Sequence, residues 1–141
     1  MEKISSQIVN SKSKIIGFMC KWCGYAAADL AGNLRKIYPT NLRIIRVACS
    51  GRIDTTHILR AFEIGADGVL IIGCHPGDCH YINGNYKAYV KVMFMKQLLK
   101  EFGLNPERLH IDWASAGEGE RFSKIVSDFV DRINKIKKVS P

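Results

Sequence analysis

The chain has 141 residues, of which 47% are hydrophobic and 24% charged, and its 21 basic and 13 acidic side chains give a formal net charge of +8. This composition is ordinary for one globular domain, which at this length buries roughly 68% of its unfolded surface, and it excludes a disordered or fibrous chain. The longest apolar run, Val69–Ile72, is far shorter than the about 20 residues that span a bilayer, and the chain does not start with a signal peptide's apolar run. We therefore expect a cytoplasmic protein without a membrane segment.

Four times along the chain, a short apolar run is followed by a turn-rich segment and then by a helical pattern. The apolar runs, all rich in Ile and Val, are Lys14–Cys20, Arg43–Cys49, Gly68–Cys74 and Leu109–Ser115. The first and third are almost entirely apolar, which is typical of strands buried on both faces. The runs therefore predict four strands.

The segments that follow these runs carry apolar residues at the 3.6-residue period of a helix. These residues are Ala27, Leu30, Leu34 and Ile37 after the first run, Val92, Met95, Leu99 and Phe102 after the third, and Phe122, Ile125, Phe129, Ile133 and Ile136 after the fourth. After the second run, Asp54 or Thr55 can cap a helix that ends at Gly65, and Gly103 is a predicted C-cap for the next helix. On that next helix, Lys87 and Lys91 predict a basic, solvated face.

The alternation of strand and helix predicts an α/β domain, (βα)4, in a flavodoxin-like three-layer arrangement. We expect a single open parallel four-stranded sheet with strand order 2-1-3-4 and helices on both faces. The single domain is expected over residues 14–137, with an N-terminal extension at 1–13 and a tail at 138–141. In such sheets, ligands bind beyond the carboxyl ends of the strands.

All five cysteines fall at this predicted edge. Cys20, Cys49 and Cys74 end three neighbouring runs, and Cys23 and Cys79 follow in the same strand-to-helix loops. Because disulfides are rare in a reducing cytoplasm, clustered cysteines indicate metal, cluster or redox chemistry there. The C-x2-C pair, Cys20 and Cys23, and the C-x4-C pair, Cys74 and Cys79, suit the two irons of a 2Fe–2S cluster held by four thiolates. Cys49 is the only unpaired cysteine and the least certain ligand.

Residues beside the cysteines are candidates for supporting roles. They are Gly24, Gly73 and Gly77 for close backbone approach to sulfur, Lys21 and Arg52 for positive charge, Trp22 as a shield from water, and His75 and His80 as hydrogen-bond donors, proton carriers or ligands. Each also has an ordinary explanation, as a loop residue satisfied by backbone groups or as an interface side chain. Glu118 fits either a contact with a partner or the first turn of a helix.

Two other chemistries use the same residues. Four cysteines, or cysteines together with His57, His75 or His80, could coordinate a structural zinc ion. A doubly wound sheet, however, does not need a metal to fold. Thiol–disulfide exchange fits the C-x-x-C between strand and helix, but no proline precedes a predicted strand where the thioredoxin cis-proline would lie beside the active disulfide, and three cysteines stay unexplained. Cysteines that merely fill a core fit poorly, because these lie in polar, glycine-bearing loops. A phosphate-binding loop is absent, and flavin is not favoured.

These motifs together resemble the delta (iron–sulfur) subunit of the methyl-viologen-reducing nickel–iron hydrogenase of methanogenic archaea. The resemblance rests on FMCKWCGY at 18–25, ACSGR at 48–52, GCHPGDCHY at 73–81 with GN at 84–85, and WASAGEG at 113–119. It extends from about Lys14 to Ile136, and none of the family's five cysteines is missing.

The resemblance implies a 2Fe–2S electron-transfer subunit that makes no bonds itself, with four of the five cysteines as ligands. Its implied partners in methanogenesis are a nickel–iron hydrogenase or a formate dehydrogenase as donor, and the flavin-containing subunit of heterodisulfide reductase as acceptor. That acceptor bifurcates electrons between ferredoxin and the heterodisulfide of coenzymes M and B. A separate polypeptide is expected, since some relatives are fused to a partner and this chain ends cleanly.

The net charge bears on the kind of partner. An oxidised cluster with its four thiolates would add about −2 and leave roughly +6. No nucleic-acid-binding motif accompanies the lysines, so we interpret the charge as attraction to acidic protein partners.

Overall fold

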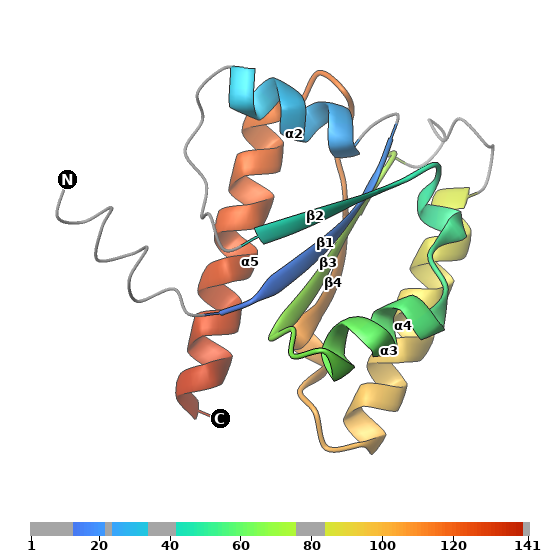
Figure 1. The fold of residues 1–141 in the computed structure, drawn as a ribbon, viewed down its shortest axis with the longest axis vertical. Helices are drawn as coiled ribbons and strands as arrows, with labels where there is room; N and C mark the ends of the chain where they lie inside the picture. The colour runs from blue at the N-terminus through green and yellow to red at the C-terminus, as the bar shows by residue number, and fades with distance from the viewer. Residues whose placement is uncertain (1–12, 22–23, 34–41, 76–83, 140–141) are drawn as a thin grey trace, which may run out of the picture.

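The computed structural model describes residues 13–21, 24–33, 42–75 and 84–139 (Figure 1). The strands are β1 (Ile15–Cys20), β2 (Leu42–Val47), β3 (Gly68–Gly73) and β4 (Leu109–Trp113), and the α-helices are α2 (Gly24–Asn33), α3 (Thr55–Glu63), α4 (Gly84–Glu101) and α5 (Gly119–Val139). Two short 3-10 helices, η1 (Ser50–Arg52) and η2 (Pro106–Arg108), precede α3 and β4. The predicted alternation of strands and helices is confirmed.

The four strands form one parallel sheet in the order β2-β1-β3-β4. This is the predicted order, with the chain running outwards from β1 to β2 and then back across to β3 and β4. In the register of the two inner strands, Phe18 lies beside Ile71 and Met19 beside Ile72. The carboxyl ends of β1, β2 and β3 therefore lie next to one another at one edge of the sheet.

Helices cover both faces of the sheet, with α2 and α5 on one side and α3 and α4 on the other (Figure 1). Alternate residues of β3 serve the two cores. Leu70 and Ile72 pack under α2 and α5, whereas Val69 and Ile71 pack under α3 and α4. Because a strand's side chains alternate between the faces, a central strand covered on both sides must be apolar throughout. Every residue of β3 is indeed buried.

The predicted helix ends are formed as capping turns. The Asp54 side chain caps α3, accepting from the Thr55 N–H at 2.7 Å, and it shares a capping box with His57. Gly103, after α4, has φ +84°, and the Leu104 N–H donates to the Leu99 carbonyl at 2.9 Å. This is the bonding of a Schellman turn, which favours glycine because its φ is positive.

Phe102 does not belong to the buried face predicted for α4. Val92, Met95 and Leu99 are buried as predicted, but the side chain of Phe102 is 71% exposed. The helix ends at Glu101 and the chain reverses at once, which turns residue 102 towards solvent.

Two strands end two residues earlier than predicted. The second was expected to reach Cys49, but β2 ends at Val47, because Cys49 instead caps η1. The fourth was expected to reach Ser115, but β4 ends at Trp113, and the Ser115 N–H is held by the Glu118 carboxylate.

Some predictions of structure fall on residues that are not described. Leu34 and Ile37 of the first predicted helix lie outside the described residues, as do most of the expected N-terminal extension and the end of the tail. Within the described ranges, none of the helices has the length and apolar character needed to cross a bilayer.

Candidate functional site

Three of the cysteines are described, and all three lie at the carboxyl edge of the sheet. Cys20 is the last residue of β1, Cys74 directly follows β3, and Cys49 lies two residues after β2. All are buried, with 1% of Cys20 and Cys74 and 5% of Cys49 exposed. The prediction that Cys20, Cys49 and Cys74 lie at one edge of the sheet is confirmed, although only Cys20 ends a strand as expected.

The sulfur atoms of Cys20 and Cys74 are 3.8 Å apart. Two thiolates bound to one tetrahedral metal through bonds of about 2.3 Å would lie about 3.8 Å apart. The spacing therefore fits two ligands of a single iron or zinc ion. It brings together one member of each predicted pair, the C-x2-C and the C-x4-C, because β1 and β3 are neighbours.

Cys74 is disulfide-bonded in this structure, whereas Cys20 keeps a thiol, with its sulfur 4.0 Å from the Ala48 carbonyl oxygen. A disulfide and a thiolate cluster both require sulfur atoms close to Cys74. The local arrangement of sulfur therefore serves either chemistry.

Cys49 is oriented by its own loop. Its side chain caps η1 and accepts from the Gly51 N–H at 3.4 Å. Among the residues that the structure describes, no three His, Cys, Asp or Glu side chains form a metal-binding group. Cys49 is thus not gathered with Cys20 and Cys74 into a three-ligand group.

The first turns of α4 support both the Cys49 and the Cys74 loops. The buried Asn85 side chain donates from Nδ2 to the carbonyl oxygens of Cys74 and His75, both at 3.0 Å. Lys91 donates from Nζ to the carbonyls of Gly51 at 3.0 Å and Ile53 at 3.1 Å. The expectation that Lys91 belongs to a solvated basic face is therefore wrong, because its ammonium group is held by the loop after Cys49.

The predicted glycines that the structure describes pack closely against other protein groups, and their approach to sulfur stays a prediction. A Cβ on Gly24 would lie 2.7 Å from the Ile72 carbonyl oxygen, and one on Gly73 would lie 2.8 Å from the Ser50 hydroxyl. Gly51 was not predicted to matter, yet a Cβ there would lie 2.8 Å from the Cα of Gly84. Glycine at these positions lets the loops and helices pack directly on one another.

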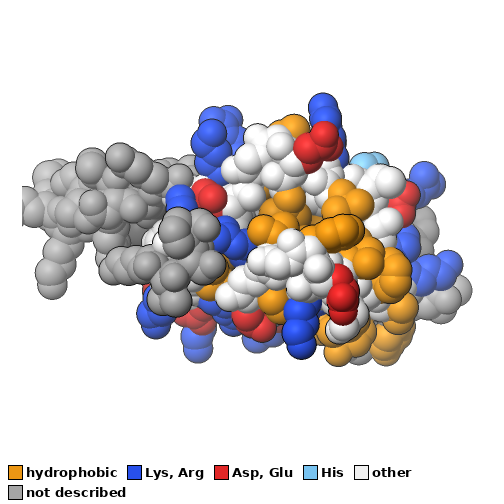
Figure 2. Space-filling model, turned by 90° about the horizontal axis from the view of Figure 1, so that it is seen from below, with side chains coloured by type: hydrophobic (Ala, Val, Ile, Leu, Met, Phe, Trp, Pro, Cys, Tyr) orange, Lys and Arg blue, Asp and Glu red, His pale blue; other side chains and the backbone are white. Residues whose placement is uncertain are grey.

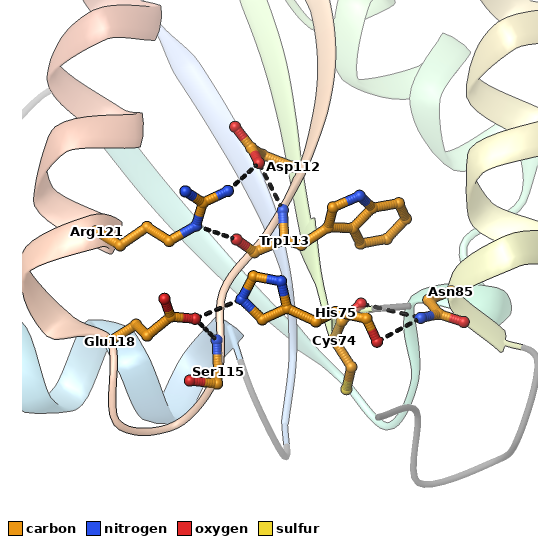
Figure 3. A network of polar contacts seen from close by, with 8 residues as sticks. All are labelled: Cys74, His75, Asn85, Asp112, Trp113, Ser115, Glu118 and Arg121. Atoms are coloured by element: carbon orange, nitrogen blue, oxygen red, sulfur yellow. Dashed lines mark hydrogen bonds and ion pairs between the residues drawn. The ribbon is translucent and has the colours of Figure 1, made fainter. Parts of the chain in front are cut away.

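His75, next to Cys74, pairs with Glu118 at the start of α5 (Figure 3). Glu118 Oε1 also accepts from the Ser115 N–H at 2.9 Å. The hydrogen bond from Ser115, followed by that from His75, lowers the pKa of Glu118 from 4.5 to about 2. Glu118 is thus held at this edge by hydrogen bonds within the chain, from Ser115 and with His75.

We expect Glu118→Gln to make the free energy of unfolding depend less on pH in the acid range. The folded pKa is depressed, so the stabilisation by Glu118 is present above its ordinary pKa of 4.5 and is lost as pH falls towards 2. Urea unfolding between pH 2 and pH 6 should show a smaller loss of stability in the variant than in the natural chain. Glu101→Gln, which removes an exposed carboxylate at the far end of α4, is the control. Equal profiles for Glu118→Gln and the natural chain would contradict this role.

A second set of contacts holds the end of β4 against α5 at the same edge of the sheet. Arg121 of α5 donates from Nε to the Trp113 carbonyl at 2.8 Å and pairs through Nη2 with Asp112 at 3.1 Å (Figure 3). Asp112 in turn accepts from the Trp113 N–H at 2.8 Å. The loop from 113 to 119, which carries Ser115 and Glu118, is therefore anchored at its start.

The other predicted residues of the site divide into three groups. Arg52 and Lys21 are exposed in the loops after β2 and β1, at the edge where they were expected. His57 accepts from the Asp54 N–H at 3.0 Å as part of the α3 cap, which gives it a structural role in place of zinc ligation. The predicted ligands Cys23 and Cys79, with Trp22, Gly77 and His80, lie outside the described residues.

Asn85 is the main residue of the site to which the sequence assigned no role. An asparagine in the first turn of a helix that follows the C-x4-C loop could have indicated it, since asparagine often bonds nearby backbone groups. Lys91 carried no comparable signal. Its partners come from a loop 38 and 40 residues earlier in the chain.

The fold and the site define an open parallel α/β domain with buried cysteines at the carboxyl edge of its sheet. The profile of the methyl-viologen-reducing hydrogenase delta subunit family matches residues 15–137. The chain belongs to this family, which confirms the resemblance seen in its motifs.

Named relatives agree with this assignment. The chain is 53% identical over 124 residues to an iron–sulfur subunit of the F420-non-reducing hydrogenase of Methanococcus voltae, covering 88% of this chain and 86% of that one. It is 45% identical over 122 residues to the corresponding hydrogenase subunit of Archaeoglobus profundus, covering 86% and 89%.

A third relative has a different architecture. The chain is 48% identical over 122 residues to a subunit of the ferredoxin:CoB-CoM heterodisulfide reductase of Methanosarcina mazei, covering 86% of this chain and only 15% of that protein. The same domain thus occurs both in short hydrogenase subunits and within a much longer polypeptide.

Proposed function

We propose that this protein is a cytoplasmic 2Fe–2S electron carrier that links a nickel–iron hydrogenase or a formate dehydrogenase to the flavin-containing subunit of heterodisulfide reductase in methanogenesis. The observation that carries the proposal is the 3.8 Å separation of the buried Cys20 and Cys74 sulfurs at the carboxyl edge of the sheet. Relatives that are named iron–sulfur subunits, and one named a heterodisulfide reductase subunit, support the choice of cofactor and partners.

The proposed ligands are Cys20, Cys23, Cys74 and Cys79, with Cys49 as the spare cysteine. Cys49 is left as the spare because it belongs to neither the C-x2-C nor the C-x4-C pair, and because among the described residues it forms no three-ligand group with Cys20 and Cys74. A 2Fe–2S cluster supplies reversible one-electron transfer when bound.

The chain's own residues would position and insulate such a cluster. Asn85 fixes the backbone of Cys74 and His75, and the two cores bury the strands that carry the cysteines. Lys21 and Arg52, exposed beside the site, would favour the reduced, more negative state of a cluster. Nothing in this role requires the chain to make or break a covalent bond of a substrate.

Anaerobic purification followed by metal analysis tests the cofactor. We expect about two iron and two acid-labile sulfide per chain, visible absorbance and a 2Fe–2S EPR signal on reduction. One zinc per chain with no colour would instead indicate a zinc-stabilised adaptor, and a colourless, metal-free chain would also reject the proposal.

Single Cys→Ser variants test the ligand set. We expect Cys20→Ser and Cys74→Ser to lose most of their iron, and Cys49→Ser to keep it. Loss of iron in Cys49→Ser, with iron kept in one of the other four variants, would reassign the spare position. If all five variants kept the full cluster, the single-site arrangement would be wrong.

Thiol–disulfide exchange is the second candidate, favoured by the disulfide on Cys74. Exchange requires a sulfur that a second thiol can reach, and both Cys20 and Cys74 are 1% exposed. Thiol titration of the anaerobic protein separates the two functions. A reversible disulfide in metal-free protein supports exchange, and iron with sulfide supports the carrier.

A further inference from the structure

The outer surface of α4 is apolar on the side that faces away from the sheet. Exposed hydrophobic side chains recur there at helical spacing, and we call them the α4 outer face: Tyr86, Tyr89, Val90, Met93 and Phe94. Val90 and Phe94 are 66% and 58% exposed. The opposite side of the same helix packs Ala88, Val92, Met95 and Leu99 into the core.

A helix at the surface of a monomer normally has one apolar and one polar side. The described part of α5 follows this rule, since its inward side carries Phe122, Phe129 and Ile133 while Lys124 and Asp128 are exposed. By contrast, α4 is apolar on both sides, which is typical of a helix covered on both sides.

The apolar surface continues beyond α4. Ile64 after α3, and Phe102 and Leu104 after α4, are also exposed. Figure 2 views the molecule from below and shows hydrophobic side chains gathered on the side where α3 and α4 lie. Contiguous apolar surface of this kind marks interaction sites, and aromatic side chains and methionine are enriched in protein interfaces.

The α4 outer face begins beside the cysteine site. Tyr86 directly follows Asn85, whose side chain holds the backbone of Cys74 and His75. Tyr89 lies with its ring centroid 6.5 Å from that of Trp113, and Trp113 pairs with Gly73 in the sheet. A protein seated on this face would therefore lie close to the sulfur atoms.

The charges around the face argue against a second copy of this chain as its occupant. Lys87 and Lys100 are exposed on α4, and Glu101 is the only carboxylate of that helix. Two copies in contact through α4 would bring these lysines together, and each chain carries a formal net charge of +8. A partner with an apolar centre and a rim of carboxylates would complement both features.

We propose that the α4 outer face is the docking surface for the electron acceptor, a protein with an apolar contact patch rimmed by carboxylates. The identity of that acceptor, the flavin-containing heterodisulfide reductase subunit from the same organism, rests on the proposed function. The apolar residues provide the buried centre of the contact, and Lys87 contributes to its basic rim.

Binding of this chain to that purified flavin-containing protein, measured by surface plasmon resonance under anaerobic conditions, tests the proposal. We expect Phe94→Ser and Val90→Ser each to weaken binding by about tenfold or more. Lys87→Glu should weaken binding most at low salt. The control is Ile45→Ser, because Ile45 is also exposed, at 45%, but belongs to β2, the edge strand at the end of the sheet away from β4, and not to α4. It should bind like the natural chain.

Several outcomes would overturn the docking surface. The first is that the natural chain does not bind, and the second is that Phe94→Ser and Ile45→Ser bind equally well. The third is that the natural chain forms a dimer that Phe94→Ser dissociates, since a second copy would then cover the face. Iron and sulfide are measured in every sample. If the cluster is absent but the α4 variants still weaken binding, the carrier function alone is rejected. If the cluster is intact but the α4 variants bind like the natural chain, the docking surface alone is rejected.

Discussion

Replacing Asn85 with alanine is expected to destabilise the chain by about 2–4 kcal/mol and to remove most of the iron from the cysteine site. The Asn85 side chain is fully buried, and its amide group is a hydrogen-bond donor to two backbone carbonyls, those of Cys74 and His75. Each buried polar group left without its partner costs about 1–3 kcal/mol. Alanine leaves both carbonyls without this donor and leaves a space at the start of α4.

Two further variants make this prediction specific. Asn85→Asp keeps the shape of the side chain but places an oxygen against the two carbonyl oxygens, so it should be at least as destabilising. Asn105→Ala is the matched control, because Asn105 is exposed and caps only η2, by accepting from the Glu107 N–H at 2.9 Å. It should cost about 1 kcal/mol and leave the iron content unchanged. Equal effects of Asn85→Ala and Asn105→Ala in urea unfolding and iron analysis would show that Asn85 does not hold the site.

Gly24→Ala is expected to cost about 1–3 kcal/mol and to alter the site, although alanine normally favours a helix. The new Cβ would lie 2.7 Å from the carbonyl oxygen of Ile72 and 3.0 Å from its Cγ2. Ile72 belongs to the central strand β3 and is fully buried, so it cannot move aside. The start of α2 must shift instead, and Cys23, a proposed ligand, is the residue immediately before it.

The matched control for this substitution is Gly117→Ala. A Cβ on Gly117 would have no other atom within 4 Å, and its φ is not positive. Its effect on stability should stay within about 0.5 kcal/mol. Thermal unfolding gives the stability of both variants, and the EPR signal of the reduced protein gives the state of the site. A Gly24→Ala protein with the stability and spectrum of Gly117→Ala would contradict the close packing of α2 on β3.

The order of the sheet and the edge that carries the site could be predicted because both follow from local patterns. Apolar runs such as 68–74, each followed by a helical pattern, dictate parallel strands, and parallel strands place their following loops at one edge. The capping residues Asp54 and Gly103 were predictable for the same reason, since capping depends on a few neighbouring residues.

What could not be predicted depends on contacts between distant segments. Asn85 and Lys91 look like ordinary residues of a helix until the loops after β3 and β2 are folded against α4. β2 ends at Val47 because η1 begins at Ser50 and Cys49 caps it. The sequence did not indicate this end, because residues typical of strands continue to Cys49. Phe102 continues the periodic spacing of α4 in the sequence, but the Schellman turn at Gly103 removes it from the buried face.

The distance along the chain between Cys20 and Cys74 has a consequence for how the site is assembled. Their sulfurs meet across 54 residues only because β1 and β3 pair side by side, and closing so long a loop has an entropic cost that the buried strands must offset. Each predicted cysteine pair is local in the sequence, but the approach of Cys20 to Cys74 is not. The pairing of β1 with β3 is therefore what brings these two sulfurs together, unlike a zinc finger, in which the metal directs the folding.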